Sequence, residues 1–188
     1  MLDKQELDAE KSKEALVPIS AVLSDTVVTV SSIDKEELSA KGYGKIENNK
    51  LELTSCEALY LLSKTVIDIK DPKSKQKISF EDLLKRFQAV DKDAWVRYLI
   101  YRDLRSRGYV AREGFGKDID FRLYERGDYG KGTAKHLIFG IQEGQPVTLE
   151  KLARTQRYTQ NLKKNLVLAV INRRGEIVYY SLSELNLK

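Results

Sequence analysis

The chain has 188 residues, of which 41% are hydrophobic and 32% are charged, and it carries a formal net charge of +5. This length and balance are typical of an ordinary globular protein that can bury a real core. The apolar runs are much shorter than the roughly 20 residues of a membrane span, and the charged N-terminus lacks the apolar segment of a signal peptide. We therefore expect a cytoplasmic protein without membrane contact.

The single cysteine, Cys56, excludes an intramolecular disulfide and a cysteine-rich metal site. We expect it to pack as a small hydrophobic side chain on a helix. The absence of disulfides fits a reducing compartment.

The first part of the chain predicts an α+β domain over residues 15–91, which follows a flexible or helical tail over residues 1–14. Runs of β-branched residues between turn signals predict strands, and two capping signatures predict helix starts. The expected elements are a hairpin within Ala15–Val30, a short helix over Ile33–Ala40, a strand pair over Ile46–Leu53 with its turn at Asn48-Asn49, a helix after the capping box Thr54–Glu57, a strand over Thr65–Lys70, and a helix after Ser79.

The polar break Asp91–Asp93 is the predicted domain boundary, and residues 92–188 predict an α/β domain with a central mixed sheet. Apolar residues at helical spacing indicate a helix at its start, and a continuous apolar run indicates a strand buried on both faces. The expected elements are a helix over Ala94–Arg107, a strand over Tyr109–Arg112, a tight turn over Gly114–Lys117, strands over Ile119–Tyr124 and His136–Ile141, a helix from Thr148 to about Lys163, the buried strand Leu166–Ile171, and a strand over Ile177–Tyr180.

A tyrosine and the only histidine of the chain flank one glycine-rich loop. Tyr124 ends a predicted strand and His136 begins the next. Pairing of these strands would therefore bring a phenol and an imidazole close together at one end of the pair. Both groups can move protons without a metal, and imidazole is the side chain whose unperturbed pKa lies nearest neutrality. A structural role for each is the alternative, because the chain has 10 tyrosines and aromatic rings commonly serve packing.

A basic stretch, Leu149–Lys164, can supply a third group. Such a cluster can follow a phosphate backbone, or it can be a solvated helix face. Its last two lysines precede the predicted buried strand, where one of them can stabilise transition-state charge beside the phenol and the imidazole. These three groups suit RNA cleavage by the 2′-hydroxyl, which supplies its own nucleophile. The basic residues of the stretch are Lys151, Arg154, Arg157, Lys163 and Lys164.

A second constellation consists of Asp118 and Asp120, with Glu143 and a lysine. Carboxylates are hard oxygen ligands, so these groups predict, as the alternative, a metal-dependent nuclease with a Mg²⁺ site. The Glu-x-Lys spacing usual in such enzymes is missing, because Glu143 is followed by Gly144-Gln145.

Several segments along the chain carry a resemblance to a known family. The motif from Tyr101 to Gly127 is specific because it combines a helix end, a strand and a tyrosine in fixed order. The matching segments are Ser39–Gly44, Glu57–Tyr60, Tyr101–Tyr109, Asp120–Gly127, His136, and Lys163-Lys164 followed by Leu166–Val170. In these segments, and from about Ala15 to its end, the chain resembles the archaeal tRNA-splicing endonucleases (tRNA-intron endonucleases) in their short single-unit form.

The resemblance implies a catalytic C-terminal nuclease domain and a role for each of three residues. By position in the family motif, the general base for the 2′-hydroxyl falls on Tyr124, and the general acid for the leaving 5′-oxygen falls on His136. The lysine that stabilises the transition state falls on Lys164 and not on Lys163. The expected products are a 2′,3′-cyclic phosphate and a 5′-hydroxyl, with no cofactor and no metal.

The resemblance also implies partners. The substrate would be precursor tRNA with a bulge–helix–bulge at its intron–exon junctions, and Arg157 matches an arginine that clamps a flipped base. Arg154 and Lys163 are further candidates for RNA contact. Family subunits dock through an acidic loop, and the matching loop offers only Glu143. Two cleavage sites per substrate imply several subunits, as a homotetramer or as a heterotetramer with a related chain. A non-catalytic scaffold subunit of the same assembly is the closest rival.

Overall fold

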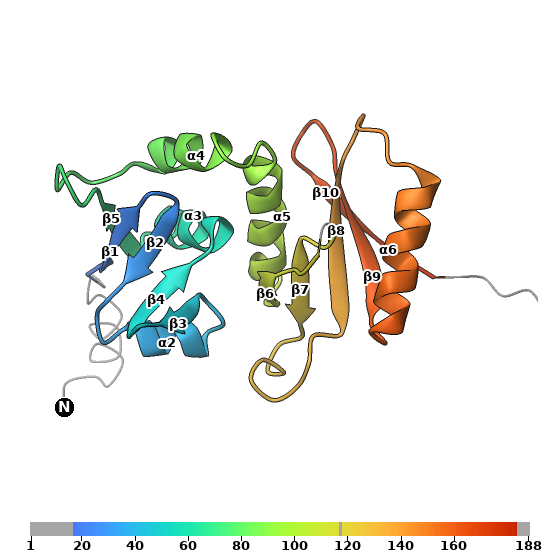
Figure 1. The fold of residues 1–188 in the computed structure, drawn as a ribbon, viewed down its shortest axis with the longest axis horizontal. Helices are drawn as coiled ribbons and strands as arrows, with labels where there is room; N and C mark the ends of the chain where they lie inside the picture. The colour runs from blue at the N-terminus through green and yellow to red at the C-terminus, as the bar shows by residue number, and fades with distance from the viewer. Residues whose placement is uncertain (1–16, 117, 184–188) are drawn as a thin grey trace, which may run out of the picture.

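Two five-stranded sheets lie on either side of helix α5 (Ala94–Ser106) in a computed structural model of the chain, which describes residues 17–116 and 118–183 (Figure 1). The tail expected over residues 1–14 lies outside the described residues, as does Lys117 in the expected turn. No helix in the described part of the chain has both the length and the apolar character needed to span a bilayer.

The N-terminal half is the predicted α+β unit, and every element expected within the described residues is present. Its sheet has the order β3-β4-β2-β1-β5 and is mixed, because β1 pairs parallel with β5 and the other pairs are antiparallel. The strands are β1 (Ile19–Ser24), β2 (Val27–Val30), β3 (Lys45–Glu47), β4 (Lys50–Leu53) and β5 (Ile67–Lys70), and the helices are α2 (Lys35–Ala40), α3 (Ser55–Ser63) and α4 (Phe80–Gln88).

Local chemistry explains where these elements start and turn. At the start of α3, the Thr54 hydroxyl accepts from the Glu57 N–H, and the Glu57 carboxylate accepts from the Thr54 N–H, which completes the predicted capping box. At the β3–β4 turn, Asn48 and Asn49 have φ angles of 46° and 62°. Asparagine tolerates this left-handed region, which a two-residue hairpin turn requires at both positions.

The C-terminal half has the predicted central mixed sheet, in the order β10-β9-β8-β7-β6. Strands β8 and β9 are parallel, and the remaining neighbours are antiparallel. Helix α6 (Leu149–Asn161) connects the parallel pair. The strands are β6 (Val110–Glu113), β7 (Phe121–Tyr124), β8 (His136–Gln142), β9 (Asn165–Ile171) and β10 (Ile177–Leu182).

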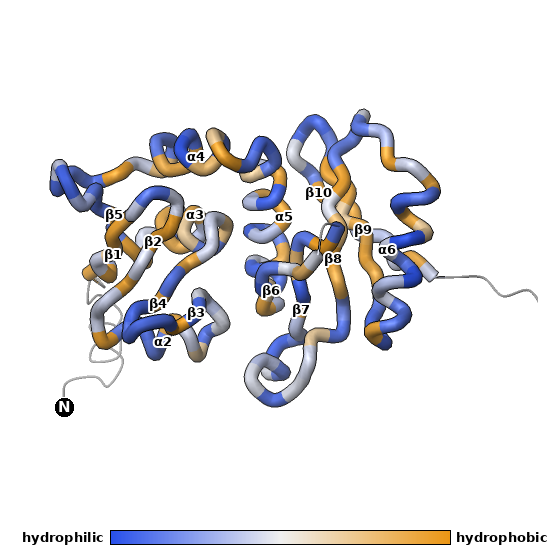
Figure 2. The backbone as a smooth tube through the Cα atoms, in the orientation of Figure 1, coloured by the Kyte–Doolittle hydropathy of each residue, from blue (hydrophilic) through white to orange (hydrophobic). Residues whose placement is uncertain are grey.

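Helices cover this sheet on both faces. Ile100 and Leu104 of α5 pack in one cluster with Phe121 and Ile138, and Leu152 of α6 packs in another. Because side chains alternate along a strand, β8 and β9 contribute apolar residues to both clusters, and they carry much of the hydrophobic colour in this half (Figure 2). This coverage explains why Leu166–Ile171 reads as a continuous apolar run. The second cluster includes Leu137, Phe139 and Leu166.

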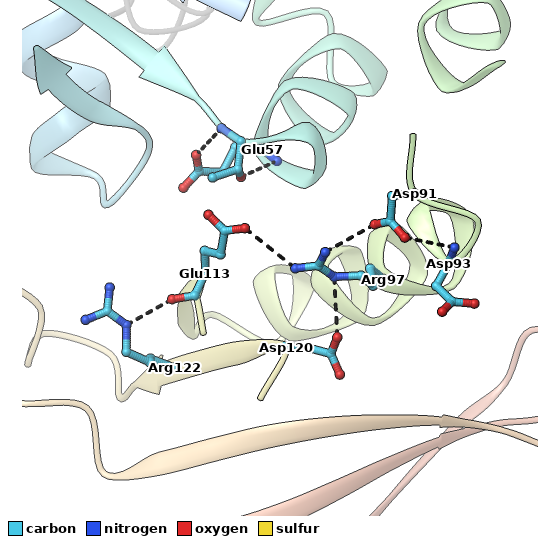
Figure 3. Close-up of polar contacts among 8 residues, drawn as sticks. Glu57, Asp91, Asp93, Arg97, Glu113, Asp120 and Arg122 are labelled. Carbon is cyan, nitrogen blue, oxygen red and sulfur yellow. Dashed lines mark hydrogen bonds and ion pairs between the residues drawn. The ribbon is translucent and has the colours of Figure 1, made fainter. Parts of the chain in front are cut away.

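A half-buried arginine on α5 ties the sheet to the segment before the helix (Figure 3). The Arg97 guanidinium lies 3.1 Å from the Asp91 carboxylate, 3.7 Å from that of Glu113 and 3.4 Å from that of Asp120. We propose the domain boundary at residues 91 and 92, within the short connection between α4 and α5. The N-terminal core nevertheless extends onto α5 through Tyr98 and Leu99.

The thiol of Cys56 is buried in α3, as expected, and burial raises its pKa to about 12. We predict that it resists thiol reagents at pH 8 in the native state and reacts at once in denaturant, measured by absorbance with a disulfide probe. An unfolded cysteine releases its proton near its ordinary pKa, so the native state holds that proton more tightly. Stability should therefore fall by up to about 1.4 kcal/mol per pH unit above pH 9.

The matched control is Cys56→Ala, which has no thiol and should therefore lose less stability above pH 9 than wild type does. Rapid native labelling, or the same pH slope in Cys56→Ala and wild type, would contradict the prediction.

Candidate functional site

Three neighbouring strands bring Tyr124, His136 and Lys164 to the same end of the C-terminal sheet. Tyr124 is the last residue of β7, and His136 is the first residue of the antiparallel strand β8. Lys164 directly precedes β9, which runs parallel to β8. Adjacent strands lie about 4.8 Å apart, so β7 and β9 flank β8 at about 10 Å from each other. The predicted pairing of the two strands around the glycine-rich loop is confirmed.

The strand register distributes the three side chains over the two faces of the sheet. His136 is paired with Leu123 on one side and with Asn165 on the other, so these side chains share a face. Tyr124 and Lys164 each lie next to one of those partners in sequence, and therefore start on the opposite face. Among the described residues, the three side chains do not hydrogen-bond to one another. They surround the end of β8 without forming a preassembled triad.

The end of helix α6 fixes where Lys164 leaves the helix. Lys163 has a left-handed φ of 54°, its N–H donates to the Gln160 carbonyl at 2.8 Å, and the Lys164 N–H donates to the Thr159 carbonyl at 3.1 Å. These two bonds form a Schellman motif, which ends a helix and turns the chain sharply. Lys163 is thus the residue at which the chain turns, and Lys164 follows it toward the start of β9.

The ammonium of Lys164 holds the far limb of the loop. Its Nζ donates to the Ala134 carbonyl at 2.5 Å and to the Thr133 hydroxyl at 3.1 Å. Both acceptors lie shortly before His136 in sequence. Lys164 therefore sets the path of the backbone that leads into His136. The position of this lysine in the sequence did not predict that role.

Ion pairs tie the two ends of the same loop together. The Lys135 ammonium lies 3.1 Å from the Glu125 carboxylate and 3.3 Å from that of Asp128, and these contacts raise the pKa of Lys135. The other oxygen of Glu125 lies 3.9 Å from His136 Nε2, while His136 Nδ1 is buried without a partner in the described part of the chain. One ring nitrogen of the histidine thus faces a carboxylate of the loop.

Tyr124 lines an open hollow of about 570 Å³ between the two halves of the molecule. Ser39 and Ile46 contribute from the N-terminal half, and Tyr129 and Gly132 contribute from the loop. The Tyr129 ring meets the Tyr124 ring edge to face, with centroids 5.2 Å apart. Glu125, Tyr129 and Thr133 were not predicted as site residues, because nothing in the sequence shows which loop residues fold back onto the strand ends.

The basic residues proposed for RNA contact lie on or after α6. Arg157 and Lys163 are exposed. Arg154 is engaged with Asp118, whose carboxylate lies 3.1 Å from its guanidinium and 3.3 Å from the Lys151 ammonium. Arg154 and Asp118 also border a hollow of about 290 Å³ that does not include the three strand-end residues.

The alternative metal site is not assembled. Asp118 is paired with Lys151 and Arg154, whereas Asp120 accepts from the Gly140 N–H at 2.7 Å and faces Arg97 at 3.4 Å. Burial raises the pKa of Asp120, against the opposing effects of the Gly140 N–H and Arg97. Carboxylates neutralised by different cations make a poor joint ligand set. Within residues 17–116 and 118–183, no cluster of at least three acidic, histidine or cysteine side chains suits a metal ion.

Glu143 lies away from these groups, in the turn that follows β8. Its carboxylate accepts from the backbone N–H of Arg173 at 3.2 Å, which joins the β8–α6 and β9–β10 connections. The side chain is exposed. Glu143 is therefore placed on a projecting turn at the end of the sheet opposite to Tyr124 and His136.

Both halves of the chain match domains of known proteins. Residues 19–84 match the N-terminal domain of the tRNA intron endonuclease, and residues 94–179 match its catalytic C-terminal domain. The chain is similar to the tRNA-splicing endonuclease of Methanococcus vannielii, with 37% identity over 90% of this chain and 96% of the relative. The corresponding protein of Methanococcus maripaludis is 36% identical over the same shares.

A more distant relative shows the same full-length correspondence. The tRNA-splicing endonuclease of Methanothermobacter thermautotrophicus is 30% identical over 86% of this chain and 95% of its own length. With both domains matched in order, the chain belongs to the tRNA intron endonuclease family.

Proposed function

We propose that this chain is an RNA endonuclease that cuts precursor tRNA at bulge–helix–bulge intron–exon junctions, without a metal in the chemical step. The observation that carries the proposal is the convergence of Tyr124, His136 and Lys164 at one end of three adjacent strands. The names of the similar proteins support the substrate, since they are tRNA-splicing endonucleases.

The reaction assigns one proton transfer to each of two residues. The Tyr124 oxygen takes the proton of the 2′-hydroxyl, and the 2′-oxygen bonds to phosphorus as the bond from phosphorus to the 5′-oxygen breaks. The His136 imidazolium gives its proton to that leaving oxygen. The products are a 2′,3′-cyclic phosphate and a 5′-hydroxyl.

The placement of these groups suits an in-line displacement. In such a reaction the attacking and leaving oxygens lie on opposite sides of phosphorus, so a base and an acid must approach from opposite directions. Tyr124 and His136 start on opposite faces of the sheet, at the ends of adjacent strands. A phosphate seated across the end of β8 can meet both.

Lys164 supplies the positive charge for the transition state. In the free chain its ammonium is occupied by the Ala134 carbonyl and the Thr133 hydroxyl. A bound phosphate oxygen would have to share or replace these acceptors, so substrate binding and the path of the loop are coupled through this residue.

RNA contact and assembly complete the proposal. Arg157 and Lys163 are exposed at the end of α6 that leads to Lys164, where they can contact an unpaired base and the backbone. Two junctions in one substrate require two active subunits. We therefore propose a homotetramer, or a heterotetramer with a related chain, with Glu143 at a docking surface.

The proposal is tested by incubating the wild-type chain with a bulge–helix–bulge precursor in excess EDTA. We expect cleavage at both junctions, with cyclic phosphate and 5′-hydroxyl ends identified by mass spectrometry. A 2′-deoxy substitution at the cleaved nucleotide should abolish cleavage, because the nucleophile is removed.

Two other results would redirect the assignment. Loss of activity in EDTA, with recovery in Mg²⁺, would favour the carboxylates Asp118 and Asp120. An inert wild-type chain that becomes active with a related subunit, and stays active in that mixture when His136 is replaced by alanine, would favour a scaffold role.

A further inference from the structure

We propose that Tyr129 is a positioning residue, which holds the phenol of Tyr124 in the orientation needed for proton abstraction. The inference rests on the proposed function, because it assigns Tyr129 an effect on Tyr124 as the base. It concerns a residue inside the glycine-rich loop, and its basis is a set of contacts that connect the loop, the strand end and the N-terminal half.

The ring of Tyr129 meets the ring of Tyr124 at an interplanar angle of 88°, with centroids 5.2 Å apart. This is the edge-to-face arrangement that aromatic pairs favour. Tyr124 ends its strand, and beyond it the chain leaves the sheet, so neighbouring strand residues restrain its side chain on one side only. The Tyr129 ring occupies a position from which it limits rotation of the phenol.

Tyr129 is itself backed by the N-terminal half of the molecule. Gly42 has a φ of +82°, and a Cβ placed on it would lie 3.5 Å from the Tyr129 ring and 2.3 Å from Val110 Cγ1. A side chain at Gly42 would therefore point at the ring and contact it, and glycine leaves only the backbone on that side of Tyr129. Tyr129 fills the space between this backbone and Tyr124.

The loop carries its own supports on both sides of Tyr129. The Asp128 N–H donates to the Glu125 carbonyl, and the Lys131 N–H donates to the Asp128 carbonyl, each at 3.1 Å. The Asp128 carboxylate lies 3.3 Å from the Lys135 ammonium. These contacts restrain the loop backbone at Tyr129, so its ring can restrict the movement of the Tyr124 ring.

The pair contributes little to the packed interior. Neither Tyr124 nor Tyr129 belongs to the three hydrophobic clusters found in the described residues, and both side chains line the open hollow. Removing the Tyr129 ring should therefore free Tyr124 without unfolding the protein. A small misplacement of a reacting group can cost up to about 100-fold in rate.

The test is single-turnover cleavage at saturating bulge–helix–bulge RNA by the full chain. Tyr129→Ala should lower the rate constant by about 10- to 100-fold, while the Kd for RNA and the thermal unfolding midpoint stay close to wild type. Tyr129→Phe should retain the wild-type rate, because the ring makes the contact.

A matched control is Trp95→Ala, which also removes a partly exposed ring from an edge-to-face pair. Trp95 and Phe80 have centroids 6.5 Å apart at 77°, and Trp95 is 39% exposed at the start of α5. This variant should cleave at the wild-type rate. Equal losses in Trp95→Ala and Tyr129→Ala would overturn the proposal, since the effect would then be general.

A double variant separates a positioning role from a structural one. In a Tyr124→Phe background, Tyr129→Ala should cause no further loss, because its effect acts through the missing hydroxyl. An additive loss would overturn the proposal, as would a wild-type rate for Tyr129→Ala beside an inactive Tyr124→Phe. Full activity of Tyr124→Phe would instead refute the assigned base, and the positioning role with it.

Discussion

His136→Ala is expected to lower the cleavage rate of a bulge–helix–bulge RNA by about 10²- to 10⁴-fold, the usual contribution of a general acid. The Kd for RNA should remain close to wild type, because the proposed role of the imidazole concerns the leaving oxygen and the positive charges of Arg157, Lys163 and Lys164 are retained. Single-turnover kinetics and a filter-binding assay measure the two quantities separately.

A substrate with sulfur in place of the leaving 5′-oxygen gives the sharper measurement. A thiolate leaves without protonation, so His136→Ala should cleave this RNA at a rate close to that of wild type. Tyr124→Phe is the matched variant, because its defect lies in activating the 2′-hydroxyl, and the same RNA should leave it slow.

Rescue of both variants, or of neither, would contradict this division of roles. Rescue of Tyr124→Phe but not of His136→Ala would instead make Tyr124 the general acid and His136 the general base. The thio-substituted RNA should not restore cleavage by Lys164→Ala, because this variant removes the proposed transition-state charge and also the donor to Ala134 and Thr133.

Local sequence signals predicted most elements of the fold correctly, because each rests on contacts within a few residues. The capping box at Thr54–Glu57 and the turn at Asn48-Asn49 are set by hydrogen bonds and backbone preferences of adjacent residues. The apolar run Leu166–Ile171 indicated a strand covered by helices, and α5 and α6 cover it. Such features can be predicted from the sequence because the residues that determine them lie close together along the chain.

The contacts that shape the site join residues far apart in the chain, and for that reason the sequence alone did not predict them. Lys164 reaches back to Thr133, and Asp118 is neutralised by Lys151 and Arg154. The second example bears on the alternative metal site, because the sequence did not show that Asp118 is paired with two cations. The family resemblance supplied the three strand-end residues, but not the loop residues that surround them.

One largely buried ion pair contributes to the contact between the two halves, and the sequence did not reveal it. Arg112 of β6 donates from Nη1 to the Glu57 carboxylate at 2.9 Å and to the Gly42 carbonyl at 3.0 Å. Glu57 is 1% exposed and already serves the capping box of α3. The same arginine therefore holds a helix start and the backbone behind Tyr129.

Arg112→Met is expected to lower the free energy of unfolding by about 3 kcal/mol at pH 7, because it leaves a buried carboxylate without its counter-charge. Urea unfolding followed by fluorescence measures this loss. The matched control is Arg86→Met, which breaks an exposed pair with Asp71 at 3.2 Å and should cost at most about 1 kcal/mol.

The loss should depend on pH, with a sign that follows from the carboxyl group. Burial raises the pKa of Glu57, against the opposing effects of Arg112 and the Thr54 N–H. Without Arg112 the native pKa rises further, whereas the unfolded value stays near 4.3. The native variant then holds a proton that the native wild type has already released, so its stability deficit relative to wild type should grow as pH rises between the two native pKa values.

Glu57→Gln distinguishes the charge from the cap. Glutamine at this position can still accept from the Thr54 N–H, so the helix start is preserved while the titrating group is removed. Combined with Arg112→Met, it should make the stability deficit independent of pH and smaller at pH 7 than that of Arg112→Met alone. A deficit of Arg112→Met that is equal at pH 5 and pH 7 would show instead that the arginine acts through the Gly42 carbonyl, as packing between the two halves.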